Sequence, residues 1–228
     1  MIHALAGIVA GTVHVLSGPD HLTAVAPLAV SSRRPAWRAG ALWGAGHTTG
    51  VWIVGALALA FREALPIERL SAWGERLVGV VLLVIGIWAL RRALTGRLHT
   101  HRHQHGASEH EHFHLHNRAD AGGHRAPGHP LRAHEHTHAA LGVGLLHGLA
   151  GSSHFLGVLP ALALPSTGAA AWYLGAYGAG TILAMASFAG VVGLVGRRTA
   201  ARTVPAYRWL LGTSAVAAIG VGCFWLIV

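Results

Sequence analysis

Six long apolar stretches, separated by polar ones, make up most of this chain of 228 residues. About twenty consecutive apolar residues are enough for a helix to cross the hydrocarbon core of a bilayer. We therefore expect six membrane-spanning helices, at residues 3–30, 39–61, 72–90, 140–164, 169–195 and 207–228. The pattern predicts an all-α, polytopic membrane protein whose surroundings are the lipid bilayer.

The two halves of the chain repeat one pattern of polar and small residues. Six positions of the first span recur in the fourth without a gap: His14, Leu16, Gly18, His21, Val25 and Pro27 match His147, Leu149, Gly151, His154, Val158 and Pro160. Each half has three spans, an odd number, so the two three-helix repeats should be inverted, as in many secondary transporters. Close packing of small residues is the alternative, and it explains the glycines but not the histidines.

A polar, low-complexity tract over residues 94–139 separates the two repeats, which we place at 1–93 and 140–228. It holds most of the histidines, many at every second position, and little that could form a core. Such a composition is typical of metal-binding segments that are disordered without metal. A solvated linker of biased composition is the alternative.

The zinc-protease pattern HExxH occurs twice in this tract, at His110 to His114 and at His134 to His138. That motif needs a stable helix to bring both histidines to one face. A His-rich tract produces the pattern by chance, so we expect no protease.

Positive charge is distributed unevenly along the chain. All 17 basic residues are arginines, the formal net charge is +9, and most arginines lie in the first, third and fifth connections. Cytoplasmic loops of membrane proteins carry such an excess, which reports orientation. We therefore expect an inner (plasma) membrane protein with both termini outside, a cytoplasmic His-rich loop and no nucleic-acid partner.

The first span carries the most unusual residues. Asp20 is the one acidic residue deep inside any expected span, and it lies between Pro19 and His21. Ionisable groups in the hydrocarbon region are costly and usually mark ion pathways or substrate sites. Pro19 removes a backbone donor and should break the helix, which frees a carbonyl oxygen for a cation. A plain proline kink with satisfied interior histidines is the alternative.

Candidate metal ligands are mainly imidazoles with one carboxylate and no thiolate. We assign them to His14, Asp20, His21, His47, His147 and His154, with Thr48, Thr49, Ser152, Ser153 and His3 as secondary candidates. Imidazole suits nickel, cobalt, zinc and copper, whereas all-oxygen sites suit magnesium, calcium and manganese. A threonine in a membrane helix more often bonds its own backbone. For His147 and His154, a polar bond between helices is the alternative.

Two weaker signals concern His3 and Cys223. A free amine, two amides and the imidazole of His3 could enclose a square-planar metal, a geometry that suits nickel or copper. Cys223 is the single cysteine, which excludes an intrachain disulfide and a dithiol relay.

Three stretches resemble the nickel/cobalt transporter superfamily. They are His14-x5-Asp20-His21, the run from Gly40 to Thr49 that contains His47, and the run from Gly144 to Ser153 that contains His147. The likeness is greatest to its short members, the permeases associated with urease maturation. The resemblance implies that His14, Asp20, His21 and His47 select the metal.

We conclude from the sequence that the chain transports a divalent transition-metal ion, most plausibly nickel or cobalt, with zinc as an alternative, and is not an enzyme. The ion is cargo, so no fixed cofactor is expected, and a cytoplasmic metallochaperone could be a partner. The competing hypothesis is a membrane-anchored metal sensor or buffer that moves nothing. Oligomeric state, direction of transport and coupling ion stay open.

Overall fold

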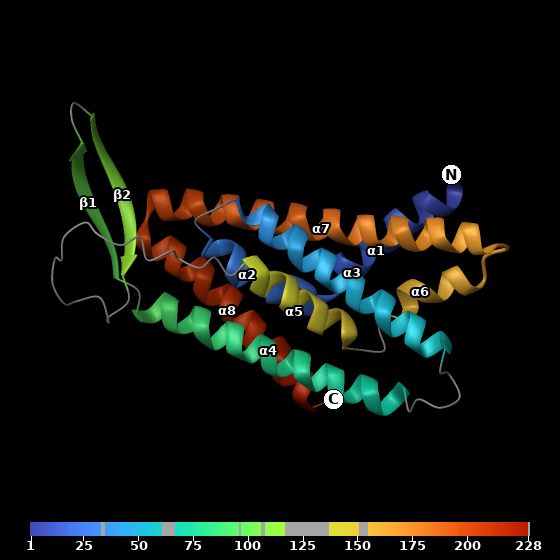
Figure 1. Ribbon diagram of the computed structural model, residues 1–228. Helices are drawn as coiled ribbons and strands as arrows, with labels where there is room; N and C mark the ends of the chain where they lie inside the picture. Colours follow the sequence, from blue (N-terminus) through green and yellow to red (C-terminus); the bar gives the residue numbers. More distant parts are fainter. Residues whose placement is uncertain are drawn as a thin grey trace.

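The computed structural model describes residues 1–32, 35–60, 67–95, 97–105, 108–116, 137–150 and 155–227. Eight helices in these ranges pack lengthwise into one bundle (Figure 1). They are α1 (Ile2–Ser17), α2 (Pro19–Val30), α3 (Ala36–Ala60), α4 (Ile67–Thr95), α5 (Thr137–Leu149), α6 (Phe155–Leu162), α7 (Thr167–Arg202) and α8 (Val204–Ile227). Each expected span overlaps at least one of these helices, and the fourth is divided between α5 and α6, with residues 151–154 outside the described part of the chain.

The first expected span is broken, as the sequence predicts. Gly18, in an extended conformation with φ −89° and ψ 102°, separates α1 from α2, and the two helices are bent by 73°. Pro19 is the first residue of α2, a position at which the missing N–H costs nothing and the fixed φ suits the helix. The break places Asp20 in the first turn of α2, where the helix dipole favours negative charge.

Long-range contacts pair the helices of the two halves. The most extensive contacts join α1 to α7, α3 to both α5 and α7, and α4 to α8. Small residues allow the close approach: a Cβ on Gly11 would overlap the carbonyl oxygen of Tyr177, and one on Gly148 would overlap the carbonyl oxygen of His47. The glycine of α5 thus holds that helix directly against the backbone of His47 on α3.

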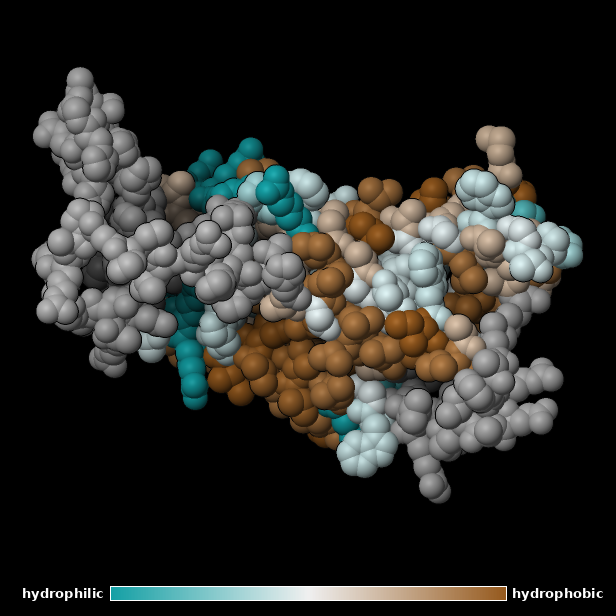
Figure 2. Space-filling view, viewed as in Figure 1, coloured by the Kyte–Doolittle hydropathy of each residue, from teal (hydrophilic) through white to brown (hydrophobic). Residues whose placement is uncertain are grey.

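A broad apolar area covers the middle of the face of the bundle that Figure 2 shows. Large apolar side chains are more than half exposed on several helices, among them Leu5, Val84, Trp172, Val191 and Trp209. By length and hydropathy, three described helices can cross a membrane, at Ala72–Thr95, Thr167–Arg202 and Val204–Ile227. The bent pair α1 and α2 is a fourth when counted as one span. These helices make the chain a membrane protein.

Apart from the start of α4, which carries Arg69 and Arg76, the arginine-bearing helix ends gather at one end of the bundle (Figure 1). They are the start of α3, the ends of α4 and α7, and the start of α8, whereas the N-terminus lies at the opposite end. Arg208 at the start of α8 donates from Nε to the carbonyl of Ala93 at 2.6 Å and from Nη2 to that of Leu94 at 2.8 Å. Arg33 and Arg34 lie outside the described residues.

The His-rich tract differs in part from the disordered loop that its composition predicts. Strands β1 (Arg97–His105) and β2 (Ser108–His116) form an antiparallel pair in which His99 lies opposite His114 and His103 opposite His110. The alternation of His with other residues has the period of a strand, which favours pairing over coil. The HExxH run from His110 lies on this strand rather than on a helix, and the run from His134 begins outside the described residues.

Candidate metal centre

Four histidines and one aspartate from four helices converge beside the break between α1 and α2. His14 lies in the last turn of α1, and Asp20 and His21 lie in the first turn of α2. His47 lies mid-way along α3, and His147 lies near the end of α5. His14 is half-buried. The other four are almost completely buried, with 0–5% of their surface exposed. The structure therefore brings together five of the six residues that the sequence assigns to the main site.

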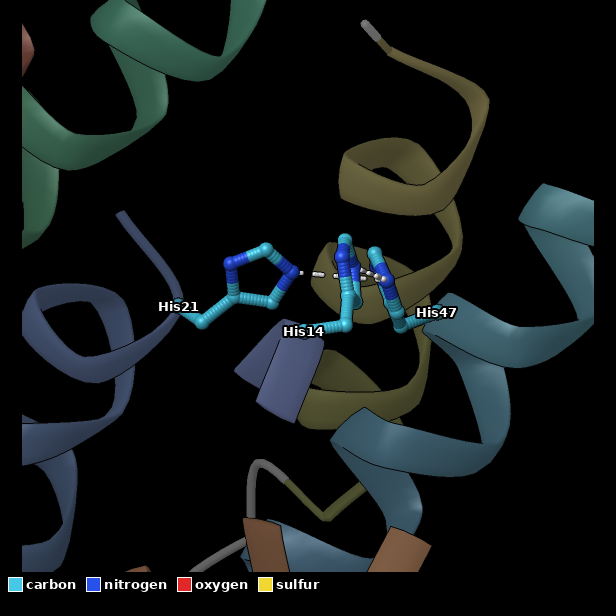
Figure 3. Close-up of side chains that lie close together, drawn as sticks. All are labelled: His14, His21 and His47. Atoms are coloured by element: carbon cyan, nitrogen blue, oxygen red, sulfur yellow. Dashed lines mark hydrogen bonds between the residues drawn. The ribbon is translucent and has the colours of Figure 1, made fainter. Parts of the chain in front are cut away.

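Three imidazoles point one nitrogen each at a common point (Figure 3). Nε2 of His47 lies 3.2 Å from Nε2 of His14 and 3.4 Å from Nε2 of His21. Two nitrogens bound to one metal at about 2.1 Å lie about 3.0 Å apart at a right angle and about 3.4 Å apart at the tetrahedral angle. These two spacings therefore fit an ion that His47 shares with His14 and with His21, and the three ligand nitrogens all lie within 4.8 Å of one another.

Asp20 fixes the orientation of the His21 ring, on the side of the ring that faces away from His47. Its Oδ1 lies 2.9 Å from Nδ1 of His21, and its Oδ2 lies 3.0 Å from Nε2 of His147. The ionised carboxylate is acceptor-only, so Nδ1 of His21 carries the ring proton and donates it to Asp20. Nε2 of His21 is then a bare lone pair aimed at His47. Carboxylate–histidine pairs orient metal ligands in this way.

Asp20 and His47 lie on opposite sides of the His21 ring. Asp20 contacts the nitrogen of His21 opposite to the one that faces His47. The reason is local: Asp20 and His21 are adjacent in the first turn of α2, and the near ring nitrogen of His21 is the one within reach of its neighbour. His147, expected to have a lesser role, contacts the carboxylate directly.

Gly18 makes room for the Asp20–His21 contact. A Cβ at this position would overlap Nδ1 of His21 and lie 2.9 Å from Oδ1 of Asp20. The sequence marks Gly18 as a repeated position but gives it no role at the site.

Trp43 is a residue that the sequence prediction misses. It is fully buried and stacks on His47, with ring centroids 5.2 Å apart and an angle of 11° between the planes. Its ring also lies 5.0 Å from that of His147 and 5.6 Å from that of His21. The available signal was its position one helical turn before His47, which puts both on the same face of α3.

The secondary candidate ligands differ in their burial and in their distance from the site. Thr48 is buried, whereas Thr49 is exposed and donates to the carbonyl of Ala45 at 2.9 Å, the backbone bond expected as the alternative. His3 lies in the first turn of α1, about 16 Å along the helix from His14. Residues 151–154 lie outside the described part of the chain, so the predictions for Ser152, Ser153 and His154 fall there.

The cluster has the chemistry of a site for a transition metal. Nε2 of His21 carries no proton and faces the Nε2 atoms of His14 and His47. A hydrogen bond joins only two of these three nitrogens at a time. A cation between the three rings can be coordinated by a lone pair from each ring, and the buried carboxylate of Asp20 offsets part of its charge. Nitrogen ligands without thiolate suit nickel, cobalt, zinc or copper.

Known proteins similar to this chain come from bacteria and plants. Over 197 residues it is 32% identical to the urease accessory protein UreH of Bacillus sp. (strain TB-90), covering 82% of this chain and 75% of UreH. It is 34% identical to the chloroplast proteins FOR GROWTH AND FERTILITY 2 and 1 of Arabidopsis thaliana, over 220 and 221 residues. These matches cover 96% of this chain and 54% and 57% of those proteins, so the chain spans little more than half of their length.

No protein-family profile matches the chain, and no solved structure does. The three relatives are named as an accessory protein and two chloroplast proteins rather than as enzymes, in agreement with the prediction that this chain is not an enzyme. The match to UreH covers three quarters of that protein at 32% identity. The chain therefore belongs to the family of membrane proteins that includes the urease accessory protein UreH.

Proposed function

We propose that this chain transports a divalent transition-metal ion, nickel or cobalt, through the centre formed by His14, His21 and His47. The observation that carries the proposal is that Nε2 of His47 lies within 3.4 Å of both Nε2 of His14 and Nε2 of His21, inside an apolar bundle. Polar groups in such surroundings are costly and are kept for ion pathways. A sensor needs only an accessible loop, whereas this centre is buried between helices.

The choice of ion rests on the ligands and the family. The centre has nitrogen ligands and a supporting carboxylate, which fits nickel and cobalt and also zinc. UreH is named for an accessory role to urease. The resemblance of the His14-to-His21 stretch to the nickel/cobalt transporter superfamily points to the same two ions.

Six spans in two inverted repeats complete the proposal. In this scheme α1–α2 is the first span of one repeat and α5–α6 the first span of the other. α1 then corresponds to α5, α3 to α7 and α4 to α8. The α1–α7 contact therefore corresponds to the α5–α3 contact, and the α4–α8 contact corresponds to itself, which is the pattern that an inverted duplication produces. Such transporters bind their substrate where the two repeats meet.

The membrane and the partners follow from the same scheme. We place the chain in the inner membrane with both termini outside and the His-rich tract in the cytoplasm, where it collects or buffers the ion and meets a metallochaperone. The chloroplast relatives show that related proteins are named for a different compartment.

Uptake of Ni²⁺ or Co²⁺ into proteoliposomes that contain the purified chain tests this function. Wild type should carry either ion, and Asp20→Asn should weaken binding by roughly 10–100-fold, the usual cost of losing a group that orients a ligand. Glu75→Gln on α4 makes the same carboxylate-to-amide change outside the site and should leave uptake unchanged. Binding without any flux in wild type would favour the sensor or buffer instead.

A further inference from the structure

His21 presents both of its ring nitrogens to groups that can hold a metal. Its Nε2 faces His14 and His47, and we call these three residues the outer triad. Its Nδ1 faces Asp20, whose second oxygen reaches His147, and we call Asp20, His21 and His147 the inner triad. His21 is the one residue common to both triads.

The inner triad meets the requirements of a metal site on its own. Its nitrogen–oxygen distances of 2.9 Å and 3.0 Å match two ligands at a right angle on one metal with bonds of about 2.1 Å. It includes the carboxylate, which supplies the negative charge that the outer triad lacks. All three of its residues are buried, whereas the outer triad contains the half-buried His14.

The geometry points to two successive positions for the transported ion, one in each triad, with His21 as the ligand common to both. This inference rests on the proposed transport of a divalent metal. A neutral imidazole offers one unprotonated nitrogen at a time, so His21 serves one position at a time and the chain holds a single ion. With metal bonds of about 2.1 Å on either side of the ring, the two positions lie about 6 Å apart.

Protons balance when the ion passes between the positions. In the outer position, Nε2 of His21 binds the ion and Nδ1 keeps the ring proton, which it donates to Asp20. In the inner position, Nδ1 binds the ion and the ring proton is on Nε2. His147 likewise keeps one ring proton, which changes from Nε2 to Nδ1 as Nε2 binds the ion. Neither ring gains or loses a proton overall.

The passage also transfers the ion between the halves of the chain. All three ligands of the outer triad come from α1, α2 and α3, within residues 1–93. The inner triad adds His147 of α5, which belongs to residues 140–228. The ion therefore moves from a position built by one half to a position at the contact of both.

Equilibrium dialysis and visible absorption with Co²⁺, on the purified full-length chain in detergent, test the two positions. Wild type should bind one Co²⁺ ion more than His21→Ala, which lacks the ligand common to both triads and keeps the His-rich tract. The amide of His147→Gln can still donate to Asp20, and the outer triad is unchanged. The Co²⁺ affinity of this variant should therefore stay within about threefold of wild type, well below the roughly 10–100-fold cost of disturbing a ligand. Its flux in proteoliposomes should fall to background. His47→Gln should still bind one ion, with the absorption spectrum shifted toward that of an oxygen-containing ligand set.

A matched control and a second variant keep the result interpretable. Glu75→Gln on α4 changes a polar side chain that belongs to neither triad and should alter neither binding nor flux. His147→Asn replaces the Gln variant if that protein does not fold. The two positions are refuted if His147→Gln loses affinity as severely as His47→Gln, since all ligands then serve one ion. They are also refuted if wild type binds two ions more than His21→Ala. Absence of Co²⁺ and Ni²⁺ binding in wild type would instead refute the proposed function.

Discussion

At the scale of single residues, the site depends on a contact that only glycine permits. Gly18 faces Nδ1 of His21 so closely that any Cβ would displace the ring from Asp20. The Asp20–His21 contact selects the tautomer of His21, and the tautomer decides which nitrogen is free for the ion. A residue that touches no ion thus controls the ligand geometry.

Gly18→Ala should reduce Co²⁺ affinity by roughly 10–100-fold, as expected when a ligand loses its orienting partner. The fold should survive, because Gly18 has φ −89°, a value that alanine adopts without strain. Equilibrium dialysis gives the affinity, and size-exclusion chromatography checks the fold. Gly175→Ala is the matched control, since nothing lies within 4 Å of a Cβ there. An unchanged affinity for Gly18→Ala would mean that His21 needs no fixed orientation.

At the scale of helices, α3 and α5 carry the site because their backbones touch. A Cβ on Gly148 of α5 would overlap the carbonyl oxygen of His47 on α3. Dispersion contacts between closely packed small residues, rather than hydrophobicity, hold helices together in a bilayer. The positions of His47 and His147 relative to each other therefore follow from this helix contact.

Gly148→Val should destabilise the protein by about 1–3 kcal/mol, the usual cost of overpacking. Thermal unfolding in detergent should show a lower midpoint, accompanied by weaker Co²⁺ binding as α5 moves away from α3. Gly142→Val on the same helix introduces the same side chain where nothing lies within 4 Å of the Cβ, and should change little. Equal midpoints for the two variants would contradict a close α3–α5 contact.

Sequence reasoning located the helices, the break at Pro19 and the residues of the centre, because apolar length and buried charge are local signals. It did not show which nitrogen of His21 faces Asp20, since that depends on side-chain direction in the first turn of α2. It missed Trp43 although this residue lies one helical turn before His47, because aromatic residues are common in apolar spans and the contact between the two rings depends on side-chain direction. The pairing of β1 with β2 was missed because the polar, low-complexity composition of the tract indicates disorder, although His at every second position has the period of a strand.

At the scale of the whole molecule, charge is separated along the bundle. The arginine-bearing ends of α4, α7 and α8 lie together, and Arg208 ties the start of α8 to the end of α4. An arginine-rich end of this kind stays on the cytoplasmic side of the membrane. The N-terminus at the opposite end of the bundle should then face outward.

A reporter that is active only outside the cytoplasm should be active when fused to the C-terminus, and inactive when inserted in the tract between α4 and α5. The reason is the arginine excess at the end of the bundle where that tract begins. Enzyme activity in whole cells measures both fusions, and immunoblotting confirms equal expression. The reverse pattern would put the His-rich tract outside and remove its role as an intracellular collector of metal.

The stacking of Trp43 on His47 gives the protein a built-in optical probe. All eight tryptophans lie among the described residues, and Trp43 alone is fully buried; six others are at least two-fifths exposed on the apolar surface. Emission from Trp43 should be blue-shifted and, at 5.2 Å from the ring of a ligand, open to quenching by a paramagnetic ion. Arrival of the proposed ion at His47 should therefore be observable by fluorescence in real time, in an unlabelled protein.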